Sequence, residues 1–310
     1  MRFIAVACLF AVALTAWAAE PFDVMDKEEF AKIVPAEAKL EKLASDMKFL
    51  EGPCWMAEDG GYLLFSDIPQ AQIKRWSEKD GLSVYRPQSN GTNGNFRDAE
   101  GRLISCEHTS RRVTRTEKDG SITVLADKYE GKRFNSPNDV VVKSDGTIWF
   151  TDPPYGTPKG EKKELEKNYV FRLDPKTKEV KAVVSDCDMP NGLAFSPDEK
   201  VLYVADSGSP KHIRAFSVNA DGTVGGGEVF CKIDKGGPDG IRVDSAGRVF
   251  SSAADGVQIF SEKGKLIGKI LVPEGPANLA FGGKEGNVLY ITARTSLYRI
   301  KLSATGAPKR

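Results

Sequence analysis

A short pattern of turn residues followed by apolar residues recurs six times along the chain. Each copy has Gly, Asp or Glu in a turn and then a run of aliphatic, β-branched and aromatic residues, which is typical of a β-strand. The copies read GGYLLFSD, EGRLISCE, DGTIWFTD, EKVLYVAD, AGRVFSSA and GNVLYITA. The steps between their marker residues are 40, 45, 54, 47 and 39 residues, for markers Gly61, Gly101, Gly146, Lys200, Gly247 and Gly286. Repeats of this length with β-rich segments are typical of propeller blades, so the pattern predicts an all-β, six-bladed β-propeller.

The segments between the copies agree with an all-β fold. Val170 to Leu173 and Val257 to Phe260 are further predicted strands, and several Asp-Gly pairs suit hairpin turns. Helix signals are few: Asp26 to Ile33 predicts a short helix that Pro35 ends. Lys39 to Ala44 predicts a strand that joins the last blade and closes the ring, which removes exposed sheet edges. We expect one domain over residues 19–310.

A polar residue precedes each copy at a nearly constant distance. The spacing to the marker is 8 residues in four copies, 9 in one and 10 in one, and the residues are Glu51, Asn93, Asn138, Asn191, Asp239 and Asn278. The innermost strands of a propeller line its channel, so equivalent positions lie at one height and converge on the axis. Carboxylate and amide oxygens suit a hard cation such as Ca²⁺ or Mg²⁺.

The alternative interpretation is that these residues only form turns, because Asn-Gly and Asp-Gly are common turn dipeptides. Recurrence in six blades favours the metal site over that alternative. Asn278 is the weakest member, since its blade lacks the Gly that follows most of the others. Those glycines predict a close backbone approach or a positive φ at the ring.

The N-terminus and the charge balance bear on location and partners. Arg2, an apolar run from Phe3 to Leu14 and the small residues around Ala18 predict a signal peptide at residues 1–18 and an exported protein, periplasmic or secreted. A membrane anchor is less favoured because the run is too short to span a bilayer. The chain has 44 basic and 43 acidic residues, and without Arg2 the charges balance at 43 each. No basic cluster stands out, so we expect no nucleic-acid partner.

Cysteine and histidine narrow the choice of site. Four cysteines follow the predicted signal, at positions 54, 106, 187 and 231, and buried thiols or disulfides are both open. The only histidines are His108 and His212, so a zinc site built on three histidines is excluded.

Longer motifs resemble a known family. They are EGPCW from Glu51, NGTNGNFRDAEGRLISCEH from Asn90, FNSPNDVVVKSDGTIWFTDPPYG from Phe134, MPNGLAFSPDEKVLYVADS from Met189 and GPDGIRVDSAGRVFSSAADGVQIF from Gly237. In this order they resemble the senescence-marker-protein/gluconolactonase/luciferin-regenerating-enzyme family, and most of all its gluconolactonase branch. The resemblance spans about residues 49–301 and implies a six-bladed propeller.

The resemblance also implies a site and an activity. One divalent cation would be ligated by Glu51, Asn138, Asn191 and Asp239, all members of the ring found above. We expect Ca²⁺, with Mg²⁺, Mn²⁺ or Zn²⁺ as alternatives. The implied activity is hydrolysis of sugar lactones. The alternatives are an esterase or phosphotriesterase on the same metal, and a non-catalytic propeller that binds a carbohydrate or protein.

Several residues are candidates for roles in catalysis. We expect Asp239 to be the general base for the attacking water, while the metal polarises the lactone carbonyl. Asn93, His108, Arg133 and Tyr155 are candidate substrate contacts, although a packing role for His108 is equally open. Asp139 is expected to support Asn138 from behind. Ser136 and Pro137 stand where the animal enzymes of the family have a substrate-binding Arg, so sugar contacts at that position do not carry over. The partner is a small lactone or ester, and the sequence does not predict an oligomeric state.

Overall fold

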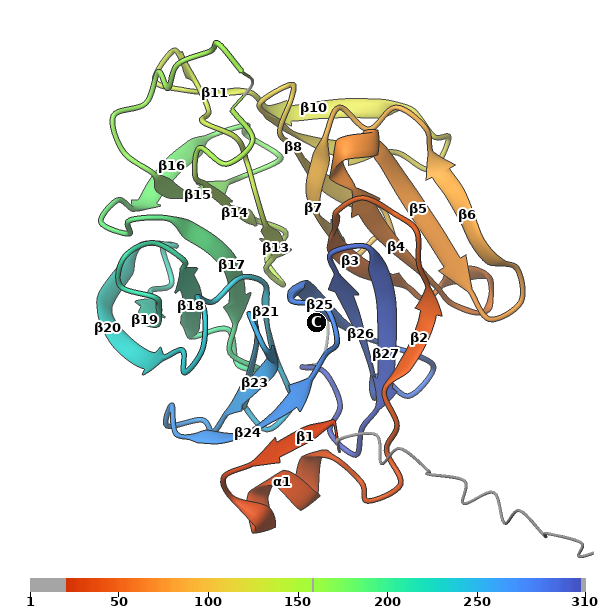
Figure 1. Ribbon diagram of the computed structural model, residues 1–310. Coiled ribbons are helices and arrows are strands. Elements are labelled where there is room, and N and C mark those ends of the chain that lie inside the picture. Colours follow the sequence, from red (N-terminus) through yellow and green to blue (C-terminus); the bar gives the residue numbers. More distant parts are fainter. Residues whose placement is uncertain (1–20, 158, 308–310) are drawn as a thin grey trace, which may run out of the picture.

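The computed structural model describes residues 21–157 and 159–307. Within them, six antiparallel sheets are arranged radially around a common axis, which confirms the predicted all-β, six-bladed β-propeller (Figure 1). The predicted signal peptide, residues 1–18, lies outside the described residues. No helix in the described part of the chain is long and apolar enough to cross a membrane.

Each blade has an innermost strand at the axis and at least three further antiparallel strands that follow it outward. The innermost strands are β3 (Leu50–Met56), β7 (Thr92–Arg97), β13 (Val140–Val142), β17 (Pro190–Phe195), β21 (Ile241–Val243) and β25 (Pro276–Gly282). The second strands, which carry the repeated pattern, are β4 (Tyr62–Asp67), β8 (Leu103–Glu107), β14 (Ile148–Asp152), β18 (Val201–Asp206), β22 (Val249–Ala253) and β26 (Val288–Ala293). The third strands are β5 (Gln72–Ser77), β9 (Arg112–Thr116), β15 (Tyr169–Leu173), β19 (His212–Val218), β23 (Gly256–Phe260) and β27 (Ser296–Lys301).

The outermost strands include one from the N-terminal segment. They are β6 (Gly81–Arg86), β10 (Ile122–Ala126), β16 (Val180–Val184), β20 (Val224–Lys232), β24 (Leu266–Leu271) and β2 (Glu41–Ala44). Strand β2 pairs antiparallel with β27, so the predicted closure of the last blade is confirmed. A contribution that the sequence did not predict is β1 (Phe22–Val24), which adds a fifth strand to the blade that contains β24. The short elements outside the blades are the hairpin of β11 (Lys128–Tyr129) and β12 (Lys132–Arg133) and the 3₁₀ turns Glu58–Gly60 and Ile68–Gln70.

The single α-helix of the described residues is α1 (Lys27–Ile33), close to the predicted span. The Asp26 side chain accepts a hydrogen bond from the Glu29 amide and caps its start. Phe30 and Ile33 bury the inner face of the helix against the blade that contains β24. In Figure 1, α1 and β1 lie together beside β24.

Apolar residues of each second strand pack on both neighbouring blades. In β14, Trp149 and Phe150 are each fully buried and, as successive residues of a strand, point to opposite faces of the sheet. Trp149 packs with Leu193 and Val204 of the next blade, whereas Phe150 packs with Ile104 of the preceding one. Burial on both faces explains why the repeated pattern is nearly continuous in apolar residues. The four cysteines are buried thiols among these contacts.

Neighbouring inner strands approach one another closely at the polar ring. A Cβ atom on Gly52 would lie 2.0 Å from the carbonyl oxygen of Asn93 in the next blade. A Cβ on Gly192 would lie 2.3 Å from the carbonyl oxygen of Asp239. Any side chain at these positions would force the strands apart, which is the reason for the repeated Gly.

Buried carboxylates at the ends of three second strands hold the loops that enter the inner strands. Asp67 accepts hydrogen bonds from the Lys48 and Phe49 amides, and Asp152 does the same for the Asn135 and Ser136 amides. Asp206 accepts hydrogen bonds from the backbone amides of Asp188 and Met189, each at 2.8 Å. These loops lead directly to Glu51, Asn138 and Asn191, so the carboxylates fix the entry of three ring residues.

We expect Asp206→Asn to lower the free energy of unfolding by about 1 to 3 kcal/mol. The amide that replaces the carboxylate has one acceptor oxygen and places an NH₂ group against backbone N–H donors. Denaturant unfolding checks this. Asp221→Asn, in an exposed turn, is the matched control and should change stability by less than about 0.5 kcal/mol. Equal effects of both changes would contradict the proposed role of Asp206.

Candidate functional site

The six predicted ring residues all lie at the start of the inner strands. Four are within the first three residues of their strands, and Asn138 and Asp239 come just before β13 and β21. Because the first strands of all blades run in the same direction along the axis, the six side chains meet at one end of the channel.

The amide side chains form one half of the ring. Asn93 Nδ2 donates to Asn138 Oδ1 at 2.7 Å, and Asn138 Nδ2 donates to Asn191 Oδ1 at 2.6 Å. His108 Nε2 lies 3.1 Å from the same Asn138 oxygen. Asn138 therefore links residues from three blades, and its burial leaves only 2 % of its surface exposed.

The acidic side chains form the other half. Glu51 Oε2 accepts hydrogen bonds from its neighbouring Gly52 amide at 2.8 Å and from Asn278 Nδ2 at 2.9 Å. The same Asn278 nitrogen lies 3.3 Å from Asp139 Oδ2. Asp239 is hydrogen-bonded to the Asn191 side chain, which joins the two halves. Asp239 is partly exposed, whereas Glu51 and Asp139 are buried.

Three carboxyl groups, those of Glu51, Asp139 and Asp239, are concentrated at this end of the axis. Burial, together with the charge of Asp139, raises the pKa of Glu51 to about 7. Burial raises the pKa of Asp239 well above its usual value, and the charges of Glu51 and Asp139 add to the rise. The one ion pair that the described residues make with these three carboxylates is that of Arg242, whose Nη1 lies 3.5 Å from Asp139 Oδ2.

The donor set fits a hard cation. Two carboxylates and two or more amide oxygens converge, and Asn93 Oδ1 is buried without a hydrogen-bond partner. The described residues contain no group of three or more His, Cys, Asp and Glu side chains placed to hold a metal ion. A cation at this ring would therefore have to use the amide oxygens of Asn138 and Asn191 as well as carboxylates.

Two of the predicted substrate contacts border the ring directly. His108 is buried, and its ring packs so closely on Gly156 that a Cβ there would lie 2.1 Å away. Burial lowers the pKa of His108 to about 4, which keeps the imidazole neutral near neutral pH. Tyr155, in the same loop, is 49 % exposed and hydrogen-bonds with Ser207 and Asn191.

Two other predicted site residues, Arg133 and Asp139, make different contacts from those expected. Arg133 lies in β12, and its Nη1 is 3.2 Å from Glu161 Oε2, so none of its described contacts is with the ring. Asp139 does not hydrogen-bond to Asn138 as expected. It instead accepts from the Val140 amide and faces Asn278 and Arg242 across the axis. The contacts of Asp139 with the ring are thus made through residues of other blades, and its support of Asn138 stays a prediction.

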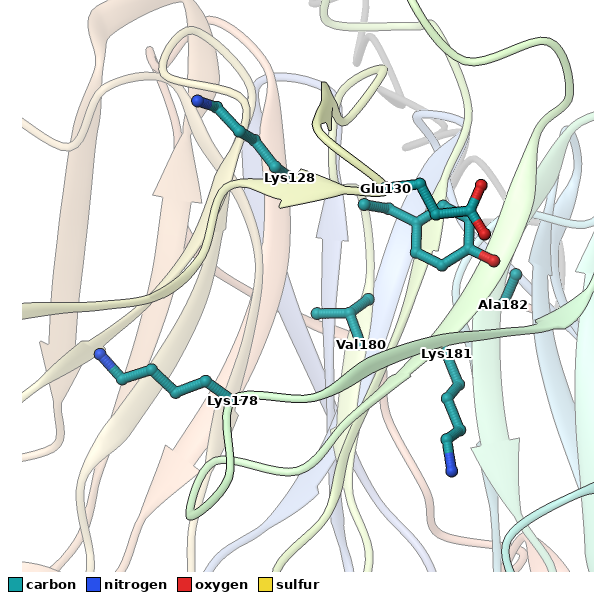
Figure 2. Close-up of a pocket in the computed structure, with 7 residues that line it drawn as sticks. Lys128, Glu130, Lys178, Val180, Lys181 and Ala182 are labelled. Atoms are coloured by element: carbon teal, nitrogen blue, oxygen red, sulfur yellow. The ribbon is translucent and has the colours of Figure 1, made fainter.

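Arg242 is a residue near the ring that no pattern in the sequence indicates. It comes three residues after Asp239, and no counterpart of it in the other blades marked the position. Its side chain also lines a hollow of about 550 Å³ at the opposite end of the axis, bounded by the last residues of the inner strands. The second described hollow, about 460 Å³, lies against the β11–β12 hairpin at the outer edge of a blade. Figure 2 shows Lys128, Lys178 and Lys181 pointing in different directions there, so they form no convergent site.

Comparison with known proteins places the chain in a family. The family model described as the SMP-30/gluconolactonase/LRE-like region matches residues 49–295. The chain belongs to this family. The family resemblance that the motifs indicated is thereby confirmed, and so is the predicted class of enzyme, a lactone hydrolase.

Individual relatives agree with this assignment. A gluconolactonase of Zymomonas mobilis is 32 % identical over 303 residues, covering 88 % of this chain and 84 % of its own. The structure of XC5397 from Xanthomonas campestris, a gluconolactonase, superposes with a TM-score of 0.86 at 36 % identity and covers 91 % of this chain and 95 % of its own. Regucalcin from Agrobacterium tumefaciens, described as a calcium-binding protein, shares the fold with a TM-score of 0.72 at 19 % identity, covering 86 % of this chain and 95 % of its own.

In the presence of a chelator, we expect this protein to lose stability as the pH rises. The folded-state pKa of Glu51, about 7, lies above its ordinary 4.5, so folding favours the protonated form. This stabilisation is complete below the ordinary pKa and is lost as the pH rises through 7, by up to about 3 kcal/mol. Denaturant unfolding in EDTA from about pH 5 to about pH 8 measures it. Glu51→Gln should make the fall smaller, with the remainder due to Asp239, whose pKa is also raised. An unchanged fall in that variant would contradict the assignment to Glu51.

Proposed function

We propose that the protein is a metal-dependent hydrolase that opens sugar lactones. The observation that carries the proposal is the convergence of Glu51, Asn138, Asn191 and Asp239 on the axis of a gluconolactonase-family propeller. These four residues would hold one divalent cation, which supplies polarisation of the lactone carbonyl and stabilisation of the oxyanion that follows.

Calcium is the ion that the donor set favours most. The four side chains offer only oxygen, and Ca²⁺ accepts irregular sets of carboxylate and amide oxygens more readily than Mg²⁺ does. Mg²⁺, Mn²⁺ and Zn²⁺ are the alternatives to be tested. The calcium binding of the structurally similar regucalcin agrees with this choice.

Asp239 is the proposed general base. It is the partly exposed carboxylate of the ring, so water and substrate reach it before the buried Glu51 and Asp139. Its bond to Asn191 orients the carboxylate, which would accept the proton of the attacking water and return it to the ring oxygen that leaves as the lactone opens.

Substrate contacts are proposed on the same side. Tyr155 is exposed and its hydroxyl interacts with Asn191 and Ser207, next to Asp239. His108 is neutral and held by Asn138, so it suits hydrogen bonding to a sugar hydroxyl better than binding an anion. Asn93 has an unpaired oxygen that could serve the cation or a substrate hydroxyl. We further propose that the enzyme acts outside the cytoplasm, periplasmic or secreted, on the basis of residues 1–18.

The purified protein is expected to hydrolyse glucono-1,5-lactone and related sugar lactones. EDTA should abolish turnover, and one ion of Ca²⁺, Mg²⁺, Mn²⁺ and Zn²⁺ should restore it best. A pH-indicator assay of lactone opening measures this, with a simple aryl ester and a phosphotriester in parallel. Turnover of the ester or phosphotriester alone would favour the esterase or phosphotriesterase alternative. Binding of one ion without turnover of any substrate would favour the binding module.

Asp239→Asn is expected to lower kcat by about 10²- to 10⁴-fold because the amide cannot accept the proton. The matched control is Asp198→Asn, in an exposed turn, which should leave kcat unchanged. Elemental analysis and circular dichroism establish whether the variant still binds metal and folds. Undiminished kcat in a folded Asp239→Asn protein would rule out this residue as the base.

Tyr155→Ala is expected to raise KM by about tenfold, as one polar contact to the substrate is lost. Arg133→Ala is the comparison variant, because Arg133 pairs with Glu161 rather than with the ring. If Arg133 contacts the substrate as the sequence predicted, its variant should raise KM at least as much. Steady-state kinetics with the best lactone decide between the two.

A further inference from the structure

We propose that Arg242 sets the net charge of the axial site and thereby its preference for doubly charged over triply charged ions. This inference rests on the metal site of the proposed function and concerns a residue outside the four expected ligands. It follows from the charges, burial and contacts of Arg242 and its neighbours.

Three carboxylates and one guanidinium meet at the ring end of the axis. Glu51 and Asp139 are 3 % and 1 % exposed, and Asp239 joins them through Asn191. A bound cation keeps all three carboxylates ionised, and with Arg242 as the one paired cation among the described residues the net charge of the protein groups around it is then −2. One divalent cation neutralises that charge, whereas a trivalent ion would leave an excess positive charge in a buried place.

The contacts of Arg242 hold its guanidinium beside Asp139. Nη1 donates to the Ile241 carbonyl at 2.7 Å and lies 3.5 Å from Asp139 Oδ2. Asp139 in turn faces Asn278, whose single amide nitrogen also holds Glu51. The guanidinium therefore acts on Glu51 through its charge, with Asp139 and Asn278 between them, and it makes no described contact with any of the four ligands' side-chain oxygens.

A packing role alone does not account for these features. The Arg242 side chain is 11 % exposed, and its Nη2 is buried without a hydrogen-bond partner. Burying a guanidinium with an unpaired nitrogen costs free energy that an apolar side chain of similar length would avoid. The charge is the property that Met lacks at this position, so Arg242→Met separates charge from packing.

The test compares Ca²⁺ with Tb³⁺ at one fixed pH, about pH 8. Calorimetric titration of the EDTA-stripped protein gives the ratio of the two dissociation constants. Arg242→Met makes the site −3 and should shift the ratio toward Tb³⁺ by roughly tenfold or more. Arg242→Lys keeps the charge and should stay close to the original ratio. The double variant Asp139→Asn with Arg242→Met returns the site to −2 and should restore the ratio to within about threefold.

An unchanged ratio in folded Arg242→Met, or a double variant that keeps the shifted ratio, would overturn the proposal. If Arg242→Met does not fold, Asp139→Asn alone makes the site −1 and should shift the ratio toward Ca²⁺; no shift overturns the proposal equally. Lactone turnover is measured in parallel. Metal-dependent turnover without the charge effect would support the proposed function and overturn the role of Arg242. The charge effect without turnover would support the role of Arg242 and overturn the proposed lactonase activity. A protein that binds neither ion would overturn both.

Discussion

The close approach of neighbouring inner strands is the constraint on which the site depends. At Gly52 and Gly192 there is no room for a Cβ between one strand and the carbonyl oxygen of the next. Strands this close bring the side chains of six blades within hydrogen-bonding reach of one another. The ring is therefore small enough for Asn138 to bond to Asn93 and Asn191 at once, and for Asn278 to reach both Glu51 and Asp139.

The same closeness makes the site electrostatically costly. Burial and mutual repulsion raise the pKa of Glu51 and of Asp239, which means that the folded chain alone disfavours both charges. The amides reduce this cost because each can donate through nitrogen and accept through oxygen. The cation of the proposed function would remove this cost by attracting the carboxylates, so the crowding that destabilises the bare ring would also favour its binding.

The features that recur in every blade could be predicted from the sequence, whereas contacts and residues that occur in one blade only could not. The blades and the ring follow from a period, and β2 follows from the need to close the last sheet. Contacts across the axis, such as Asn278 to Asp139 over 139 residues, have no local signal. Arg242 has no equivalent in the other blades, and Arg133 was placed by its nearness to a motif although it lies in a hairpin outside the blades. Asp206 and its counterparts were visible as the end of the repeated pattern, but their role in holding the ring loops needed the structure.

The two ends of the axis differ in what they can bind, and Arg242 belongs to both. At the ring end, Asp239 and Tyr155 are accessible and polar groups converge, as a hydrolytic site requires. At the other end, the hollow is bounded by Trp55, Phe195 and Phe281 and by no residue of the ring. Arg242 lines that hollow while its Nη1 faces Asp139, so a positive charge lies beneath the acidic site. Such a charge would oppose the approach of a cation from that end, so the proposed metal and the lactone would both reach Asp239 from the side on which Asp239 and Tyr155 are accessible.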